Sequence, residues 1–165
     1  MKSPHLLLAG RNLRKIKANL EGVLDQAALG AIEAEIEKNA TQLIQLAREH
    51  LRFARRLRPA SWRQSVSRAY YATYSASRAV RLQISGDYTT DSEDHKRVGE
   101  LPEGFPKRNM YANQLGVLRE DRNACDYDHT ATDADLVLGR TEALALATGF
   151  VQDVCDFLGG RGLKP

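Results

Sequence analysis

The chain has 165 residues, of which 42% are hydrophobic and 27% charged, a size and balance typical of one soluble globular domain. Lysine and arginine (24) nearly balance aspartate and glutamate (21), so the net charge of +3 permits a nucleic-acid partner without requiring one. No stretch approaches the ~20 apolar residues of a membrane span, and the two cysteines form no CxxC motif. We therefore expect a cytoplasmic protein with no membrane contact and with free thiols.

The spacing of apolar residues predicts helices almost throughout the chain. A weaker helical segment covers residues 5–28. A stronger stripe of residues three and four apart begins at Ile32 and ends before Pro59, which cannot continue a helix. A third helix follows from Pro59 to Ile84. No run of alternating β-branched residues indicates a strand.

The segment 85–107 is rich in acids, glycine and proline and predicts a long acidic loop with one helical turn near His95, a composition that also allows mobility. A helix with Met110, Tyr111 and Leu115 inward follows it. Thr132 is the expected N-cap of the last helix, which ends at the glycines after Leu158.

Together these segments predict an all-α protein, a four-to-five-helix up-and-down bundle with an extra N-terminal helix. Residues 1–30 form the N-terminal helical extension, and residues 31–160 form the bundle domain with the acidic loop inside it.

Two stretches carry a resemblance to a known family. "SRAYYATYSASRAV" (67–80) resembles the signature helix of small bacterial HEPN domains, and "LREDRNACDYDH" (118–129) resembles the Arg-x-x-Ala-Asp-Tyr segment of the same family. The resemblance covers roughly residues 38 to 158. It implies the same bundle fold, usually assembled as a homodimer.

The resemblance also implies a function, because many members of this family are metal-independent endoribonucleases. Their active site pairs an arginine with a histidine a few residues later, and dimerisation brings two such motifs into one cleft. In this sequence Arg122 and His129 occupy those places, with Asn123 as the polar residue after the arginine. Many members are toxins or defence effectors restrained by a minimal nucleotidyltransferase antitoxin, whereas others lack the histidine and act as binding modules.

The chemistry of these residue types fits cleavage of RNA by its own 2′-hydroxyl. An imidazole exchanges protons near neutral pH, and a guanidinium offers a fixed fork of donors to phosphate oxygens. The reaction needs no cofactor, and the sequence contains no convincing metal-binding cluster. Further residues that would support or bind at this site are Asp126, Tyr127, Asp128, Arg68, Tyr71 and Arg78.

Other interpretations stay open for the same residues. Arg122 would also fit an ion pair with Asp126 one helical turn later, and His129 would also fit a solvated loop. Asp126 and Asp128 would either raise the pKa of His129 or repel phosphate. The tyrosines of the third helix suit a core as well as a base-stacking surface. His50 and His95 look isolated and ordinary.

Three hypotheses therefore follow. The first is a HEPN-type endoribonuclease with Arg122 and His129 as catalytic residues. The second is a catalytically silent HEPN module that binds a nucleotidyltransferase, a nucleotide or RNA. The third is a helical scaffold subunit. The basic stretch "REHLRFARRLR" (48–58) is either an RNA-contacting strip or an ordinary helix end, where the helix dipole favours cations.

Overall fold

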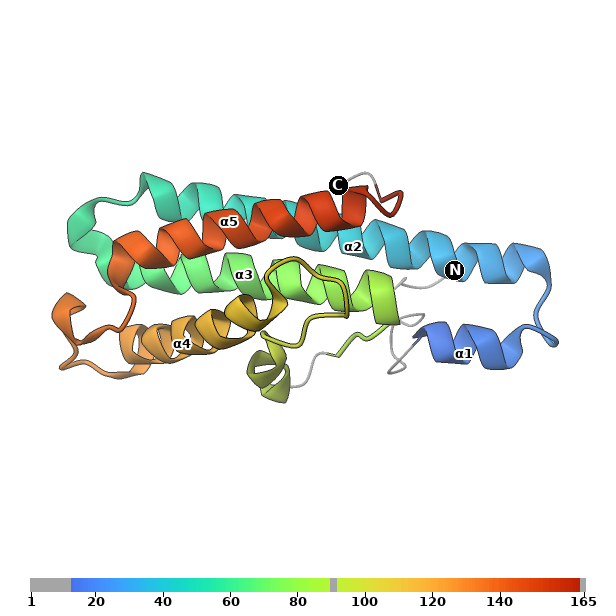
Figure 1. The fold of residues 1–165 in the computed structure, drawn as a ribbon, viewed down its shortest axis with the longest axis horizontal. Coiled ribbons are helices and arrows are strands. Elements are labelled where there is room, and N and C mark those ends of the chain that lie inside the picture. Colours follow the sequence, from blue (N-terminus) through green and yellow to red (C-terminus); the bar gives the residue numbers. More distant parts are fainter. Residues whose placement is uncertain (1–12, 90–91, 164–165) are drawn as a thin grey trace.

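A computed structural model of the protein, described over residues 13–89 and 92–163, confirms the all-α prediction (Figure 1). Four long helices pack together beside a short N-terminal helix, and none of the described residues forms a strand. The helices are α1 (Leu13–Leu20), α2 (Gln26–Arg56), α3 (Trp62–Ser85), α4 (Arg108–Tyr127) and α5 (Gly139–Gly159), with 3₁₀ turns η2 (Pro59–Ser61), η3 (Ser92–Arg97) and η4 (Asp133–Asp135).

Helix α3 is the centre of the bundle, because it packs against α2, α4 and α5 (Figure 1). Its buried positions include many small side chains, which let the neighbouring helices approach closely. The largest fully buried side chains of the core come from all four long helices and from Val98. They include Ile36, Ile44, Tyr70, Leu82, Leu115, Leu118, Phe150 and Leu158.

The first two helices differ from the prediction in their limits. Helix α1 ends at Leu20, and α2 begins at Gln26, where the Asp25 carboxylate accepts a hydrogen bond from the Ala28 amide at 2.7 Å. Helix α2 therefore crosses the boundary expected at residue 30. It ends at Arg56, before Pro59, as predicted. Residues 5–12 of the expected first helix lie outside the described part of the chain.

The described part of the acidic loop 85–107 is fastened to the bundle. Asp94 is 1% exposed and accepts two hydrogen bonds from Arg81 of α3, at 2.8 and 2.9 Å. The Ser77 hydroxyl donates to the Val98 carbonyl at 2.8 Å. A buried ion pair and the buried apolar side chains of Val98, Leu101 and Phe105 therefore hold the described part of this loop against the bundle.

The last helix begins later than predicted. Thr132 closes a capping box with Asp135 around the single turn η4, and α5 starts only at Gly139. The reason lies in α4, where the buried Asp121 carboxylate accepts hydrogen bonds from the amides of Val137 and Leu138, at 2.9 and 2.8 Å. These bonds occupy donors that a helix starting at Thr132 would need.

Met110, expected inward, is among the exposed large hydrophobic residues, whereas Tyr111 and Leu115 are buried as predicted. Cys125 and Cys155 are buried free thiols. Within the described residues, no helix is long and apolar enough to span a membrane.

Candidate functional site

Arg122 lies on α4 against the tyrosines of α3, and its guanidinium is held from several sides. Its Nη2 donates to the Tyr71 hydroxyl, and its Nη1 donates to Asn123 Oδ1 at 3.1 Å. The guanidinium carbon lies 5.2 Å from the Tyr71 ring centre and 5.7 Å from that of Tyr70. These distances are typical of cation–π contacts, so α3 positions this charge.

The last turn of α4 covers the same guanidinium. Asp126 lies 2.8 Å from Arg122 Nε, in an ion pair without aligned hydrogen-bond geometry, which confirms the predicted contact one turn along the helix. The Tyr127 ring centre is 5.3 Å from the guanidinium carbon, and its hydroxyl accepts a long 3.5 Å bond. Arg122 is consequently only 11% exposed in its side chain, whereas Tyr127 is 74% exposed.

A pocket of about 490 Å³ adjoins this cluster between α3 and α4. We call it the α3–α4 pocket. Two residues of the cluster, Tyr71 and Asp126, line it, so Arg122 lies behind its wall. Its lining combines cationic, polar and aromatic groups, namely Arg63, Gln64, Ser67, Arg68, Tyr71, Cys125 and Asp126.

Arg68 lines this pocket and also lines a second hollow, which lies on the flank of α2. Its Nη1 lies 3.4 Å from His50 Nδ1, and its guanidinium carbon lies 5.6 Å from the Phe53 ring centre. The His50 ring in turn tilts against Tyr71 at 5.7 Å. Arg68 is exposed, and among the described residues it has no carboxylate partner. Its charge is therefore available to an anion.

The loop that carries His129 is anchored by Arg63 of α3. The Arg63 guanidinium donates to the carbonyls of Cys125 and Asp128, at 2.9 and 2.7 Å, and to the Ala131 carbonyl. It thereby satisfies carbonyls that the end of α4 leaves without helical partners. This arrangement fixes the backbone on both sides of His129.

His129 itself is exposed, and it does not belong to the Arg122 cluster. Among the described residues its imidazole makes no hydrogen bond or ring contact, and its only interaction is electrostatic, with Asp128. The Asp128 carboxylate is occupied by Thr130, whose amide and hydroxyl both donate to it. Arg122 lies near the C-terminal end of α4, and His129 follows that end in the next loop. Within one chain their side chains do not contact each other.

A different histidine lies under the tyrosines. His95 of η3 stacks on Tyr74 at 4.1 Å between ring centres, and its Nδ1 is 2.8 Å from the Tyr70 hydroxyl. Arg78, predicted to support the site, faces this region instead: it donates to the Thr89 carbonyl at 2.9 Å and lies 3.5 Å from Asp94. It packs against the acidic loop rather than against Arg122.

Burial and nearby cations set the protonation of these groups. Burial lowers the pKa of His50 and His95, and the positive charges of Arg68 and Arg122, respectively, lower them further. Both shifts favour the neutral imidazole. Burial, together with Asp126, raises the pKa of the Cys125 thiol to about 12, so this cysteine is a packing residue and not a nucleophile.

The contacts of His50, His95 and Arg63 were not predicted from the sequence. Each lies far in sequence from the residue it contacts, so local spacing carried no signal for it. In the described part of the chain, no group of three histidine, cysteine, aspartate or glutamate side chains could hold a metal ion.

Comparison of the chain with models of protein families, with curated proteins and with solved structures found no match.

Proposed function

We propose that this chain is a HEPN-type domain that binds RNA at the α3–α4 pocket. The observation that carries the proposal is the exposed Arg68 guanidinium, which contacts the His50 imidazole and the Phe53 ring and forms no ion pair with a carboxylate of the described residues. It lines a concave surface together with the Tyr71 ring, the Gln64 amide and the Ser67 hydroxyl.

These side chains can bind the phosphate, sugar and base groups of single-stranded RNA. A guanidinium binds phosphate oxygens, a tyrosine ring can stack on an unpaired base, and hydroxyl and amide groups bind sugar and phosphate. Asp126 is the one carboxylate of this lining, and the charge of Arg122 at 2.8 Å compensates it. The pocket therefore favours an anionic ligand with planar bases.

Arg68→Gln is expected to weaken binding of a fluorescently labelled 12-nucleotide single-stranded RNA several-fold at 100 mM salt, because one phosphate contact is lost. Fluorescence anisotropy measures this change. Arg68 is exposed, so the variant should keep the stability of the wild type. Lys38→Gln, which removes the same charge from an exposed site on α2, is the control and should bind as the wild type does. Equal affinities for all three proteins would contradict the proposal.

A second candidate function is metal-independent cleavage of the bound RNA, with Arg122 and His129 as the catalytic pair. The observation that favours it is that Arg63 fixes the loop on which His129 is exposed. In a homodimer, two such loops would meet at one cleft, so that His129 of one copy would act beside Arg122 of the other. A fixed, exposed imidazole is suited to proton transfer.

Cleavage is tested with the wild type, His129→Ala, His50→Ala and His95→Ala, incubated with the same RNA in EDTA and analysed on denaturing gels. We expect loss of cleavage in His129→Ala and retained cleavage in His50→Ala. His95→Ala disturbs the tyrosine cluster, and its unfolding curve shows how much stability this change removes. Light scattering establishes whether the wild type is a dimer. If the wild type binds RNA and leaves it intact, cleavage is wrong and RNA binding stands.

A further inference from the structure

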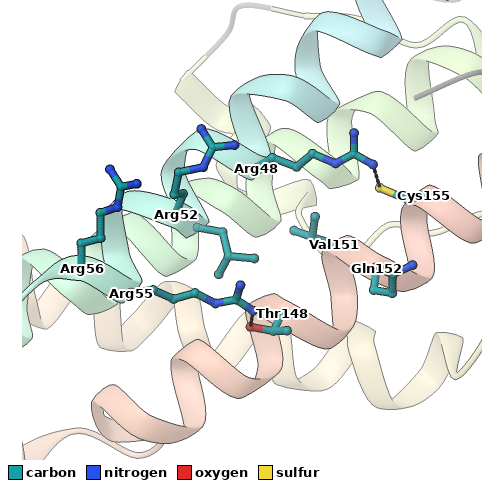
Figure 2. Close-up of a pocket in the computed structure, with 9 residues that line it drawn as sticks. Arg48, Arg52, Arg55, Arg56, Thr148, Val151, Gln152 and Cys155 are labelled. Atoms are coloured by element: carbon teal, nitrogen blue, oxygen red, sulfur yellow. Dashed lines mark hydrogen bonds between the residues drawn. The ribbon is translucent and has the colours of Figure 1, made fainter.

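A second concave surface lies on the opposite flank of α2, in the groove between α2 and α5 (Figure 2). It has a volume of about 420 Å³. The α2 wall carries Arg48, Arg52, Arg55 and Arg56, and the α5 wall carries Thr148 and Gln152. We call this surface the arginine groove. No acidic residue lines it, in contrast to the α3–α4 pocket.

The four guanidiniums of the arginine groove have no carboxylate partner within the described residues. Arg55 donates to the Thr148 hydroxyl at 2.7 Å, and Arg48 donates to the Cys155 sulfur at 3.3 Å, so both bridge to neutral atoms of α5 (Figure 2). Arg52 and Arg56 make no hydrogen bond or ion pair with any described residue, and Figure 2 shows them projecting from the α2 side. The positive charge of the groove is therefore uncompensated.

The dipole of α2 does not account for all four arginines. A helix dipole favours cations only in the last turn, and only Arg55 and Arg56 lie there, whereas Arg48 lies two turns earlier. Arg48 and Arg52, and also Arg52 and Arg56, are like charges four residues apart, an arrangement that destabilises a helix. Bound anions would remove this repulsion.

We propose that the arginine groove binds the phosphodiester backbone of single-stranded RNA. Arg48 to Arg56 extend over about 12 Å of helix axis, enough to contact successive phosphates. The ligand class rests on the proposed RNA-binding function, but the surface is separate from the α3–α4 pocket.

One strand can reach both the arginine groove and Arg68, because Arg68 packs against the other flank of α2. His50 and Phe53 face the hollow that Arg68 lines, and Arg52 and Arg56 face the groove on the other flank. A strand that crosses the exposed face of α2 reaches both.

The test compares the double variant Arg52→Gln/Arg56→Gln with the control Lys38→Gln/Lys96→Gln. Both lose two positive charges from exposed sites, so the general attraction of RNA to a cationic protein changes equally. Anisotropy titrations of labelled 12-nucleotide poly(U) between 50 and 300 mM KCl give the salt dependence of binding. For single strands each phosphate contact contributes about −0.7 to the slope of log K against log salt, so the groove variant should lose about 1.4 from that slope. The control should keep the slope of the wild type.

Arg68→Gln in the same titrations separates the two sites. An unchanged slope in the groove variant overturns the groove proposal, while weaker binding by Arg68→Gln leaves the proposed function in place. A lowered slope in the groove variant with unchanged binding by Arg68→Gln supports the groove and overturns the pocket. If poly-glutamate binds the wild type as tightly as poly(U), and the groove variant loses both, the groove recognises acidic protein and the RNA assignment is wrong.

Discussion

Asp94→Ala is expected to lower the free energy of unfolding by about 3–5 kcal/mol, because it leaves a buried arginine without its main partner. Asp94 accepts both hydrogen bonds of the Arg81 fork, and its Oδ2 also accepts the Tyr74 hydroxyl at 2.9 Å. Asp87 remains 3.5 Å from Arg81 and offsets only part of the loss. Urea unfolding followed by circular dichroism measures the change.

Two further variants make this result specific. Glu93→Ala removes an exposed carboxylate of the same turn that pairs with Lys96, and it should change stability by less than about 1 kcal/mol. Arg81→Met/Asp94→Ala should lose clearly less than the sum of the two single variants, since no unpaired buried charge is left. Strict additivity of the two losses would contradict the buried ion pair.

The contribution of Asp94 should depend on pH in one direction. Burial alone would raise its pKa, but the hydrogen bonds and the charge of Arg81 outweigh burial and lower it below the usual 3.8. A carboxylate with a lowered folded-state pKa stabilises the protein above its unfolded pKa, and this stability is lost as the pH falls through the folded pKa. The difference between wild type and Asp94→Ala should therefore be constant from pH 5 to 7 and shrink below about pH 4.

Asp121→Ala should cost about 2–4 kcal/mol, because two backbone amides lose a buried charged acceptor. Asp121 is 3% exposed and holds the amides of Val137 and Leu138 at the start of α5. Arg63 holds the beginning of the connection between α4 and α5 through backbone carbonyls, and buried Leu136 packs into the core near its end. We expect faster hydrogen exchange in residues 128–138 and a lower urea midpoint.

Asp133→Ala is the matched control for Asp121→Ala, because Asp133 lies exposed in the same connection. It should leave stability within about 0.5 kcal/mol of the wild type and exchange unchanged. If both variants behave alike, the hydrogen bonds of Asp121 do not hold this segment.

The parts of the fold that follow local rules were predictable. The stripe of α2 repeats every three or four residues over seven turns, and Pro59 stops it, so its existence and C-terminal end followed from the sequence. The ion pair of Arg122 with Asp126 also followed, since residues four apart on a helix are neighbours. Each of these features depends on residues close in the chain.

The features that the sequence did not predict depend on residues far apart in the chain. The start of α5 is set by Asp121, sixteen residues before Val137, and the loop is held by Arg81, thirteen residues before Asp94. The acidic sequence around Asp94 is typical of a solvated loop, because the sequence does not show that Arg81 is its buried partner. In the same way, His95 looked isolated because its contacts with Tyr70 and Tyr74 span more than twenty residues.

A continuous series of contacts joins Asp94 in the acidic loop to Arg122 on α4. Asp94 binds the Tyr74 hydroxyl, His95 stacks on Tyr74 and meets the Tyr70 hydroxyl, and the Tyr70 ring lies 5.7 Å from the Arg122 guanidinium. If Arg122 takes part in the proposed function, random mutagenesis scored by phenotype would therefore recover substitutions at Asp94 and Arg81 alongside those at Arg122. Only parallel measurement of the amount of folded protein in each mutant would separate a broken scaffold from a broken ligand contact.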